Sequence, residues 1–113
     1  MDELSTTGFT KVSEYRNGMV HTFYLHPADV GLPVATKENL AGGTAAENAA
    51  MIEELCAGAT GPRRDIVCFN AGAGLLIAGV VGSVPDGIAM AGKALSDGTT
   101  ARTLSALREA CGK

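Results

Sequence analysis

The chain has no tryptophan and few other aromatic residues. Two tyrosines and three phenylalanines are present, whereas hydrophobic residues make up 46% of the 113 positions. Alanine and glycine are frequent, so we expect a core built from small side chains. A chain of this length forms one domain at most and buries roughly two-thirds of its unfolded surface on folding.

Positive charge is scarce as well. Nine lysines and arginines stand against twelve aspartates and glutamates, which gives a formal net charge of −3 without blocks of either sign. This distribution offers no electrostatic footprint for a nucleic-acid backbone or an anionic membrane surface. We therefore expect no nucleic-acid partner and no membrane partner.

Cysteine is sparse and scattered. Cys56, Cys68 and Cys111 are odd in number and never spaced as C-x-x-C, so neither a zinc site nor a disulfide framework follows. Reduced thiols are typical of the cytoplasm, where we expect the chain to be located. The N-terminus also lacks the basic stretch and apolar run of a signal peptide.

One long uncharged stretch, residues 66–84, raises the alternative of a membrane span. It contains Asn70, Ser83 and several glycines. That composition favours a helix buried on all sides within a globular protein.

A β-hairpin is predicted over about residues 10–26, because two runs rich in Val, Thr, Phe and Tyr flank Asn17-Gly18. Asn-Gly is the preferred pair for a two-residue type I′ turn, and this turn sets Val12 opposite Phe23. A lone hairpin is marginal in water, so its apolar patch needs a packing partner.

Four helices are predicted after the hairpin, each ended by glycine. Thr44 and Glu47 have the spacing of a capping box, in which two side chains satisfy free backbone amides at a helix start. The predicted helices cover about residues 45–57, 63–81, 84–97 and 101–111. The expected fold is therefore an α/β fragment, one hairpin followed by four mostly buried helices. Because the second helix is apolar on every face, we also expect association with a partner through exposed apolar surface.

Several motif matches are set aside. Residues 87–94 have the spacing of a phosphate-binding P-loop, but Ala94 replaces the hydroxyl that would hold Mg²⁺. Gly72 and Gly74 lack the third glycine of the dinucleotide fingerprint. Both stretches are interpreted as helix interiors, and Gly72 and Gly74 as positions where helices approach closely.

The two histidines and a cluster of charged residues are given structural interpretations. His21 and His26 lie on opposite faces of one strand and cannot chelate a metal together. Arg63-Arg64-Asp65 begins a helix and is interpreted as a solvated or interface cluster rather than a phosphate site.

Asp2 and Glu3 are the candidate metal ligands. Two carboxylates at successive positions of a loop can both reach one Mg²⁺, whereas on a strand they would point apart. Mg²⁺ held in this way keeps several waters and takes its other ligands from substrate phosphates. A disordered acidic terminus is the alternative from these residues alone. No catalytic side chain and no site for an organic cofactor is singled out.

Longer stretches of the sequence carry a family likeness. They are Asp2-Glu3-Leu4-Ser5-Thr6-Thr7-Gly8 and residues 27–32, 40–43, 47–49, 61–67, 70–79 and 94–98. Together these stretches resemble the C-terminal third of the anthranilate phosphoribosyltransferases, the tryptophan-pathway branch of the nucleoside phosphorylase and phosphoribosyltransferase family. Phe9 departs from the likeness, because the family commonly has proline there.

The resemblance implies a glycosyltransferase of the pentosyltransferase class. In such enzymes the amine of anthranilate displaces pyrophosphate from C1 of phosphoribosyl pyrophosphate, and Mg²⁺ accompanies the pyrophosphate. The acidic pair of the family matches Asp2 and Glu3, which implies that these residues bind one such metal ion.

The resemblance also implies an incomplete enzyme. Residues 1–113 correspond to the C-terminal part of the α/β catalytic domain, without the N-terminal helical domain and the glycine-rich pyrophosphate loop. We expect no transferase activity from the chain alone. Two alternatives stay open: a fragment like pyrimidine nucleoside phosphorylase, and a non-catalytic module that assembles with a separately encoded N-terminal part.

Overall fold

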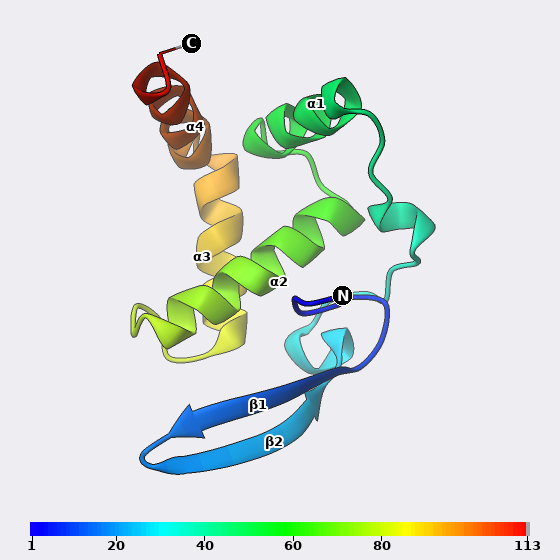
Figure 1. Cartoon of the computed structure of the whole chain (residues 1–113), viewed down its shortest axis with the longest axis vertical. Coiled ribbons are helices and arrows are strands. Elements are labelled where there is room, and N and C mark those ends of the chain that lie inside the picture. The colour runs from blue at the N-terminus through cyan, green and yellow to red at the C-terminus, as the bar shows by residue number, and fades with distance from the viewer. Residues whose placement is uncertain (113) are drawn as a thin grey trace.

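The hairpin predicted from Asn17-Gly18 is present and projects away from the helices (Figure 1). In the computed structural model, which describes residues 1–112, β1 (Thr10–Arg16) pairs antiparallel with β2 (Met19–Leu25). Asn17 and Gly18 both have positive φ, as a type I′ turn requires. The predicted register is confirmed, with β2 ending one residue before the predicted boundary.

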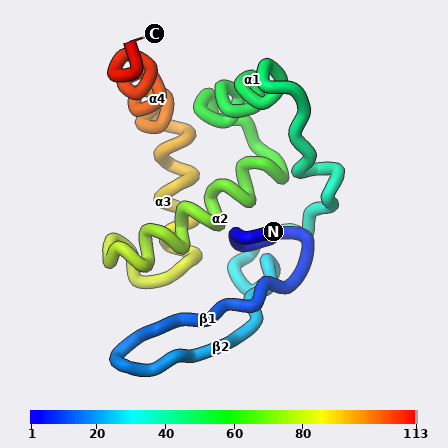
Figure 2. The backbone as a smooth tube through the Cα atoms, in the orientation of Figure 1, coloured from blue at the N-terminus to red at the C-terminus, as the bar shows by residue number. Residues whose placement is uncertain are grey.

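The hairpin lies outside the helical core. Figure 2 shows its backbone as a long loop that extends away from the helices. In the part of the chain that the structure describes, β1 and β2 pair only with each other. Phe23 and Tyr24 are 41% and 63% exposed. On the apolar face of the hairpin, residues 1–112 thus cover Phe23 only in part, whereas Val12 and Leu25 on the same face are half-buried.

Two short 3₁₀ turns connect the hairpin to the helices. They span Pro27–Val30 and Glu38–Leu40. The first is capped by His26, whose Nδ1 accepts a hydrogen bond from the backbone N–H of Ala28 at 3.1 Å. The sequence of residues 36–40 favours a short helical turn, and the second 3₁₀ turn lies within them.

The four predicted helices are present. They are α1 (Ala45–Cys56), α2 (Pro62–Ile77), α3 (Val84–Ser96) and α4 (Thr99–Ala110). At the start of α1, the backbone N–H of Glu47 donates to the Thr44 hydroxyl at 3.2 Å, and the Glu47 carboxylate accepts from the Thr44 N–H at 3.0 Å. The capping box is therefore confirmed.

The end of α2 differs from the prediction. The helix was expected to continue to Val81 and stop at Gly82, but it ends at Ile77. Gly79 takes a left-handed φ of 76°, and its N–H donates to the carbonyl of Leu76. A helix continuing to Val81 would leave only two residues to turn the chain back into α3. Gly79 therefore terminates α2 early enough for α3 to return across it.

The crossing of α2 and α3 forms the centre of the fold (Figure 1). Gly72 of α2 and Gly87 of α3 meet there with their backbones in contact, and a Cβ built on Gly72 would lie 2.7 Å from the Ile88 nitrogen. Phe69, one helical turn before Gly72, has no exposed surface. Of the glycines predicted to allow close helix approach, Gly72 does so, whereas a Cβ on Gly74 would meet no atom within 4 Å. Residues 87–94 lie within a helix rather than a P-loop.

The expectation of mostly buried helices is wrong. Cys56 is the only buried residue of α1, and α4 has none within the residues described. Within residues 1–112, the buried apolar side chains are Pro27, Ala35, Cys56, Cys68, Phe69 and Leu95. Burial is limited because the helices spread over a body of 45 × 31 × 22 Å instead of enclosing one another. Within residues 1–112, no helix combines the length and apolar character that a membrane span requires.

Candidate functional site

The acidic pair lies beside an open cleft of about 660 Å³. The backbone bends at Glu3, and both Asp2 and Glu3 line the cleft and are exposed. The hydroxyl-bearing residues Ser5 and Thr7 line it as well. Asp2 and Glu3 therefore line the same cleft, from a bend in the backbone rather than from an extended strand.

Hydrogen bonds hold the segment that follows the acidic pair. The N–H of Leu4 donates to Oδ1 of Asn70 on α2 at 2.8 Å, and Nδ2 of Asn70 donates to the Leu4 carbonyl at 2.9 Å. The N–H of Ser5 donates to the Thr10 hydroxyl at 2.9 Å. The Thr6 carbonyl accepts from the N–H of Ala35 at 2.8 Å. These contacts attach the segment both to the start of the hairpin and to α2.

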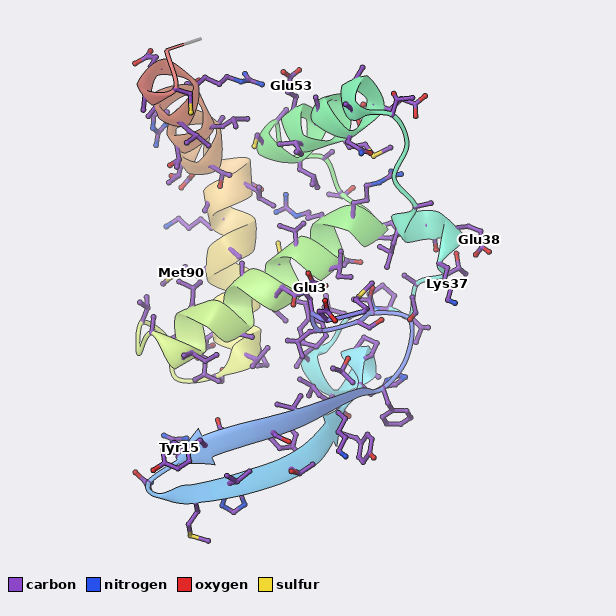
Figure 3. All side chains as sticks on the ribbon, in the orientation of Figure 1. Glu3, Tyr15, Lys37, Glu38, Glu53 and Met90 are labelled. Atoms are coloured by element: carbon purple, nitrogen blue, oxygen red, sulfur yellow. The ribbon has the colours of Figure 1, made fainter. Side chains whose placement is uncertain are left out.

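Charges of both signs meet in this cleft. Lys11 of β1 and Lys37 of the second connection line it together with the acidic pair. Figure 3 labels Glu3 and Lys37, which come from the N-terminal segment and from the chain after the hairpin. The cleft therefore offers oxygen donors for a cation and ammonium groups for an anion.

The donor chemistry fits Mg²⁺. Carboxylate and hydroxyl oxygens are the ligands that this hard cation prefers, and it is commonly held by one or two carboxylates with waters and phosphates. Within residues 1–112 there is no group of three or more His, Cys, Asp or Glu side chains placed to hold a metal. Asp2 and Glu3 would leave most coordination positions to water or phosphate, and metal binding there stays a prediction.

A second cleft, of about 330 Å³, lies between α2 and α3 and contains Arg64, Asp65 and Cys68. Arg64 spans the helices: its guanidinium donates to the Gly92 carbonyl at 2.8 Å and to the Ser96 hydroxyl at 2.9 Å. The interpretation of Arg64 as part of a solvated or interface cluster is therefore wrong. It links two helices of the same chain.

Burial governs the titration of the groups beside Arg64. Desolvation raises the pKa of Asp65 above its usual value, and the nearby Arg64 charge opposes this effect. Desolvation also raises the pKa of the Cys68 thiol, again against the Arg64 charge and with a smaller contribution from Asp65. Cys68 is 3% exposed, and the raised pKa of its thiol is the opposite of the lowered pKa that activates a nucleophilic cysteine.

The two histidines have separate environments, and only His26 has a clear structural role. His26 caps the first 3₁₀ turn, where the Asp29 carboxylate also accepts from the His26 N–H at 2.9 Å. Its ring lies 4.8 Å from that of Phe9 between centroids. His21 is exposed in β2, opposite Glu14.

Asn70, Lys11 and Lys37 were missed as site residues by the sequence reasoning. A signal existed for Asn70, because it is a lone amide within an uncharged helical run and such a group needs partners when it is buried. No local pattern marks the lysines. They reach the cleft only because the chain folds back beside its own N-terminus.

Comparisons with known proteins agree on one family. The glycosyl transferase family, a/b domain, matches residues 1–101. The anthranilate phosphoribosyltransferase of Symbiobacterium thermophilum is 43% identical over 109 residues, which are 96% of this chain and 32% of that protein. The enzyme of that name from Caulobacter vibrioides is 46% identical over 107 residues, or 95% of this chain and 31% of the relative.

A solved structure is similar as well. The crystal structure of anthranilate phosphoribosyltransferase from Thermus thermophilus superposes with a TM-score of 0.78 at 39% sequence identity. The match covers 87% of this chain and 29% of that one. The chain thus spans about a third of the length of the relatives that it matches.

Proposed function

The chain belongs to the glycosyl transferase family, in its a/b domain, and from that premise we propose that it is part of an anthranilate phosphoribosyltransferase. The reaction would join the amine of anthranilate to C1 of phosphoribosyl pyrophosphate and release pyrophosphate. The same proposal assigns the chain to tryptophan biosynthesis and to the cytoplasm. The observation that carries it is the cleft in which Asp2 and Glu3 lie together.

The acidic pair would hold Mg²⁺ in this proposal. The ion, when bound, supplies positive charge that stabilises the departing pyrophosphate. Asp2 and Glu3 supply the carboxylate oxygens, and Ser5 and Thr7 add hydroxyl oxygens nearby. Lys11 and Lys37 line the same cleft, so phosphate oxygens there would face ammonium groups as well. These residues bind and orient the leaving group rather than exchange protons with the substrate.

The remainder of the active site would come from polypeptide equivalent to the other two-thirds of the relatives. The chain exposes 7344 Å², whereas a compact monomer of 11.5 kDa exposes about 5,800 Å². The excess of about 1,500 Å² is roughly twice the ~800 Å² that each partner buries in a standard protein interface. Exposed apolar side chains are concentrated on and beside the hairpin: Phe9, Tyr15, Met19, Val20, Phe23 and Tyr24. We propose that this surface packs against the rest of the catalytic domain.

A chimeric enzyme tests the catalytic proposal. In it, this chain replaces the C-terminal third of the Caulobacter vibrioides relative. Loss of anthranilate fluorescence is followed with phosphoribosyl pyrophosphate and Mg²⁺. We expect turnover by the chimera and none by the chain alone. The same chimera with Asp2→Asn and Glu3→Gln tests the acidic pair, because this double variant removes both charges at nearly constant volume. It is expected to lower kcat/KM by about 100-fold.

Other outcomes would favour the alternatives. A folded chimera that does not turn over anthranilate but cleaves thymidine with phosphate would support the alternative of a fragment like pyrimidine nucleoside phosphorylase. A chain that forms a stoichiometric complex with the N-terminal two-thirds of the relative, seen by light scattering, but restores no turnover would support a non-catalytic module. Turnover of anthranilate by the chain alone would contradict the proposal that it is incomplete.

A further inference from the structure

Asn70 connects the acidic segment to α2 across 66 positions of sequence. Its Oδ1 accepts from the Leu4 N–H at 2.8 Å, and its Nδ2 donates to the Leu4 carbonyl at 2.9 Å. One carboxamide thus pairs with both backbone polar groups of a single residue, as an adjacent strand would. This geometry fixes the position and the direction of the backbone at Leu4.

The carboxamide is itself held in place. Nδ2 of Asn70 also donates to the Ile66 carbonyl, one turn earlier on α2, at 3.0 Å. Phe69, the residue before Asn70, is fully buried at the centre of the fold. The contact with Leu4 therefore starts from a rigid part of the molecule, and Asn70 transmits the position of α2 to the N-terminal segment.

Leu4 directly follows the two carboxylates. Asp2 and Glu3 are exposed, and in the structure neither side chain makes a hydrogen bond to another described residue that would orient it. Leu4 is the position nearest to them that is bonded to a helix. Without that contact, rotation of the backbone at residues 2–4 would separate the carboxylates from the cleft, because fixing a backbone requires compensating interactions.

We propose that Asn70 is a positioning residue for the divalent-cation site, holding Asp2 and Glu3 together at the cleft through the Leu4 backbone. This inference rests on the proposed function, which assigns the cation to that pair. Asn70 does not touch the cation; it fixes the backbone from which the two ligands project. Partners of this kind around metal sites commonly affect affinity strongly although they bind no metal.

The chain contains a matched control for this contact. Asn48 on α1 accepts from the Gly43 N–H at 2.8 Å and donates to the Gly43 carbonyl at 3.3 Å. The same carboxamide-to-backbone pairing is thus made at a place that does not line the cleft. Asn48→Ala removes the same kind of hydrogen bonds as Asn70→Ala without disturbing the acidic segment.

The experiment measures binding of Mn²⁺ alone to the 113-residue chain by the electron paramagnetic resonance signal of the free ion. We expect Asn70→Ala to raise the dissociation constant about tenfold, at the lower end of the effect of such outer partners. Asn48→Ala is expected to leave it unchanged, although both variants lower the melting temperature. Weakening by both variants alike, or by neither, would overturn the positioning role.

A double variant, Asp2→Asn with Glu3→Gln, distinguishes failure of the positioning role from failure of the proposed cation site. Mn²⁺ binding that survives the double substitution would overturn the cation site itself and the inference built on it. Binding that is lost in the double variant but retained in Asn70→Ala would overturn the positioning role alone.

A second variant covers the case in which Asn70→Ala unfolds, as judged by circular dichroism. Asn70→Gln keeps both hydrogen-bonding groups and displaces them by one methylene. Weakened Mn²⁺ binding by folded Asn70→Gln supports the positioning role, because the ligands have moved while the hydrogen-bonding capacity is unchanged. Wild-type affinity in this variant would refute it.

Discussion

The closest helix contact in the fold makes a sharp prediction for Gly72→Ala. A Cβ at Gly72 would lie 2.7 Å from the backbone nitrogen of Ile88 and 2.9 Å from the carbonyl carbon of Gly87. Both atoms belong to the backbone of α3, so no side-chain rotation can relieve the contact. The two helices must separate by several tenths of an ångström, which also loosens the packing around Phe69.

Two effects of opposite sign set the magnitude. Alanine is favoured over glycine within a helix by about 0.5–1 kcal/mol. Overpacking of a tight contact costs about 1–3 kcal/mol. The upper end applies here because the atoms nearest to the new Cβ, the Ile88 nitrogen and the Gly87 carbonyl carbon, both belong to the backbone. We expect Gly72→Ala to lower the free energy of unfolding by about 2 kcal/mol, which corresponds to a decrease of about 8 °C in Tm.

Gly74→Ala is the matched control on the same helix. A Cβ at Gly74 meets no atom within 4 Å, so only the helix-propensity gain of about 0.5–1 kcal/mol remains. Guanidinium denaturation followed by far-UV circular dichroism measures both variants. If Gly72→Ala proves as stable as Gly74→Ala, the helices do not cross as closely as described and the reasoning fails.

Two further predictions concern Arg64 and Asp97. Arg64→Met should lower the free energy of unfolding by about 2 kcal/mol in the same assay, because it removes the links from α2 to Gly92 and Ser96. Arg63→Met, which removes one exposed bond to Ala41, should cost less, and equal losses would contradict a cross-helix role. The pKa of Asp97 lies below its usual value of 3.8, because the Thr99 hydroxyl and then the Thr99 N–H donate to the carboxylate. A lowered folded pKa contributes stability above 3.8 that is lost as the pH falls through the folded value. The difference in denaturation midpoint between wild type and Asp97→Asn should therefore be largest at pH 7 and shrink below about pH 3.8. A difference that does not change with pH would refute the lowered pKa of Asp97.

Sequence reasoning succeeded where a few neighbouring residues decide the structure. Asn17-Gly18 alone specified the turn and hence the pairing of every residue across the hairpin, since a two-residue turn leaves one register. Thr44 and Glu47 likewise marked the start of α1 to the residue. The family likeness followed from the same kind of short, nearly contiguous pattern.

The same reasoning failed where distant segments compete. Both Gly79 and Gly82 are able to end α2, and the return of α3 onto Gly72 decides between them. The burial of the helices was overestimated, because an apolar face shows that a partner is needed but not whether this chain supplies it. Arginine is usually a surface residue, and Arg64 acquires its partner Gly92 only when α3 lies beside α2.

The candidate site divides in the same way. Amino-acid order by itself determined that two carboxylates stand side by side, because adjacency in a chain is covalent. Tertiary structure alone decided that they share a cleft with Lys11 and Lys37 and that Asn70 holds the backbone beside them. Such pairings depend on the folding of segments tens of residues apart, and short-range sequence patterns carry no information about that distance.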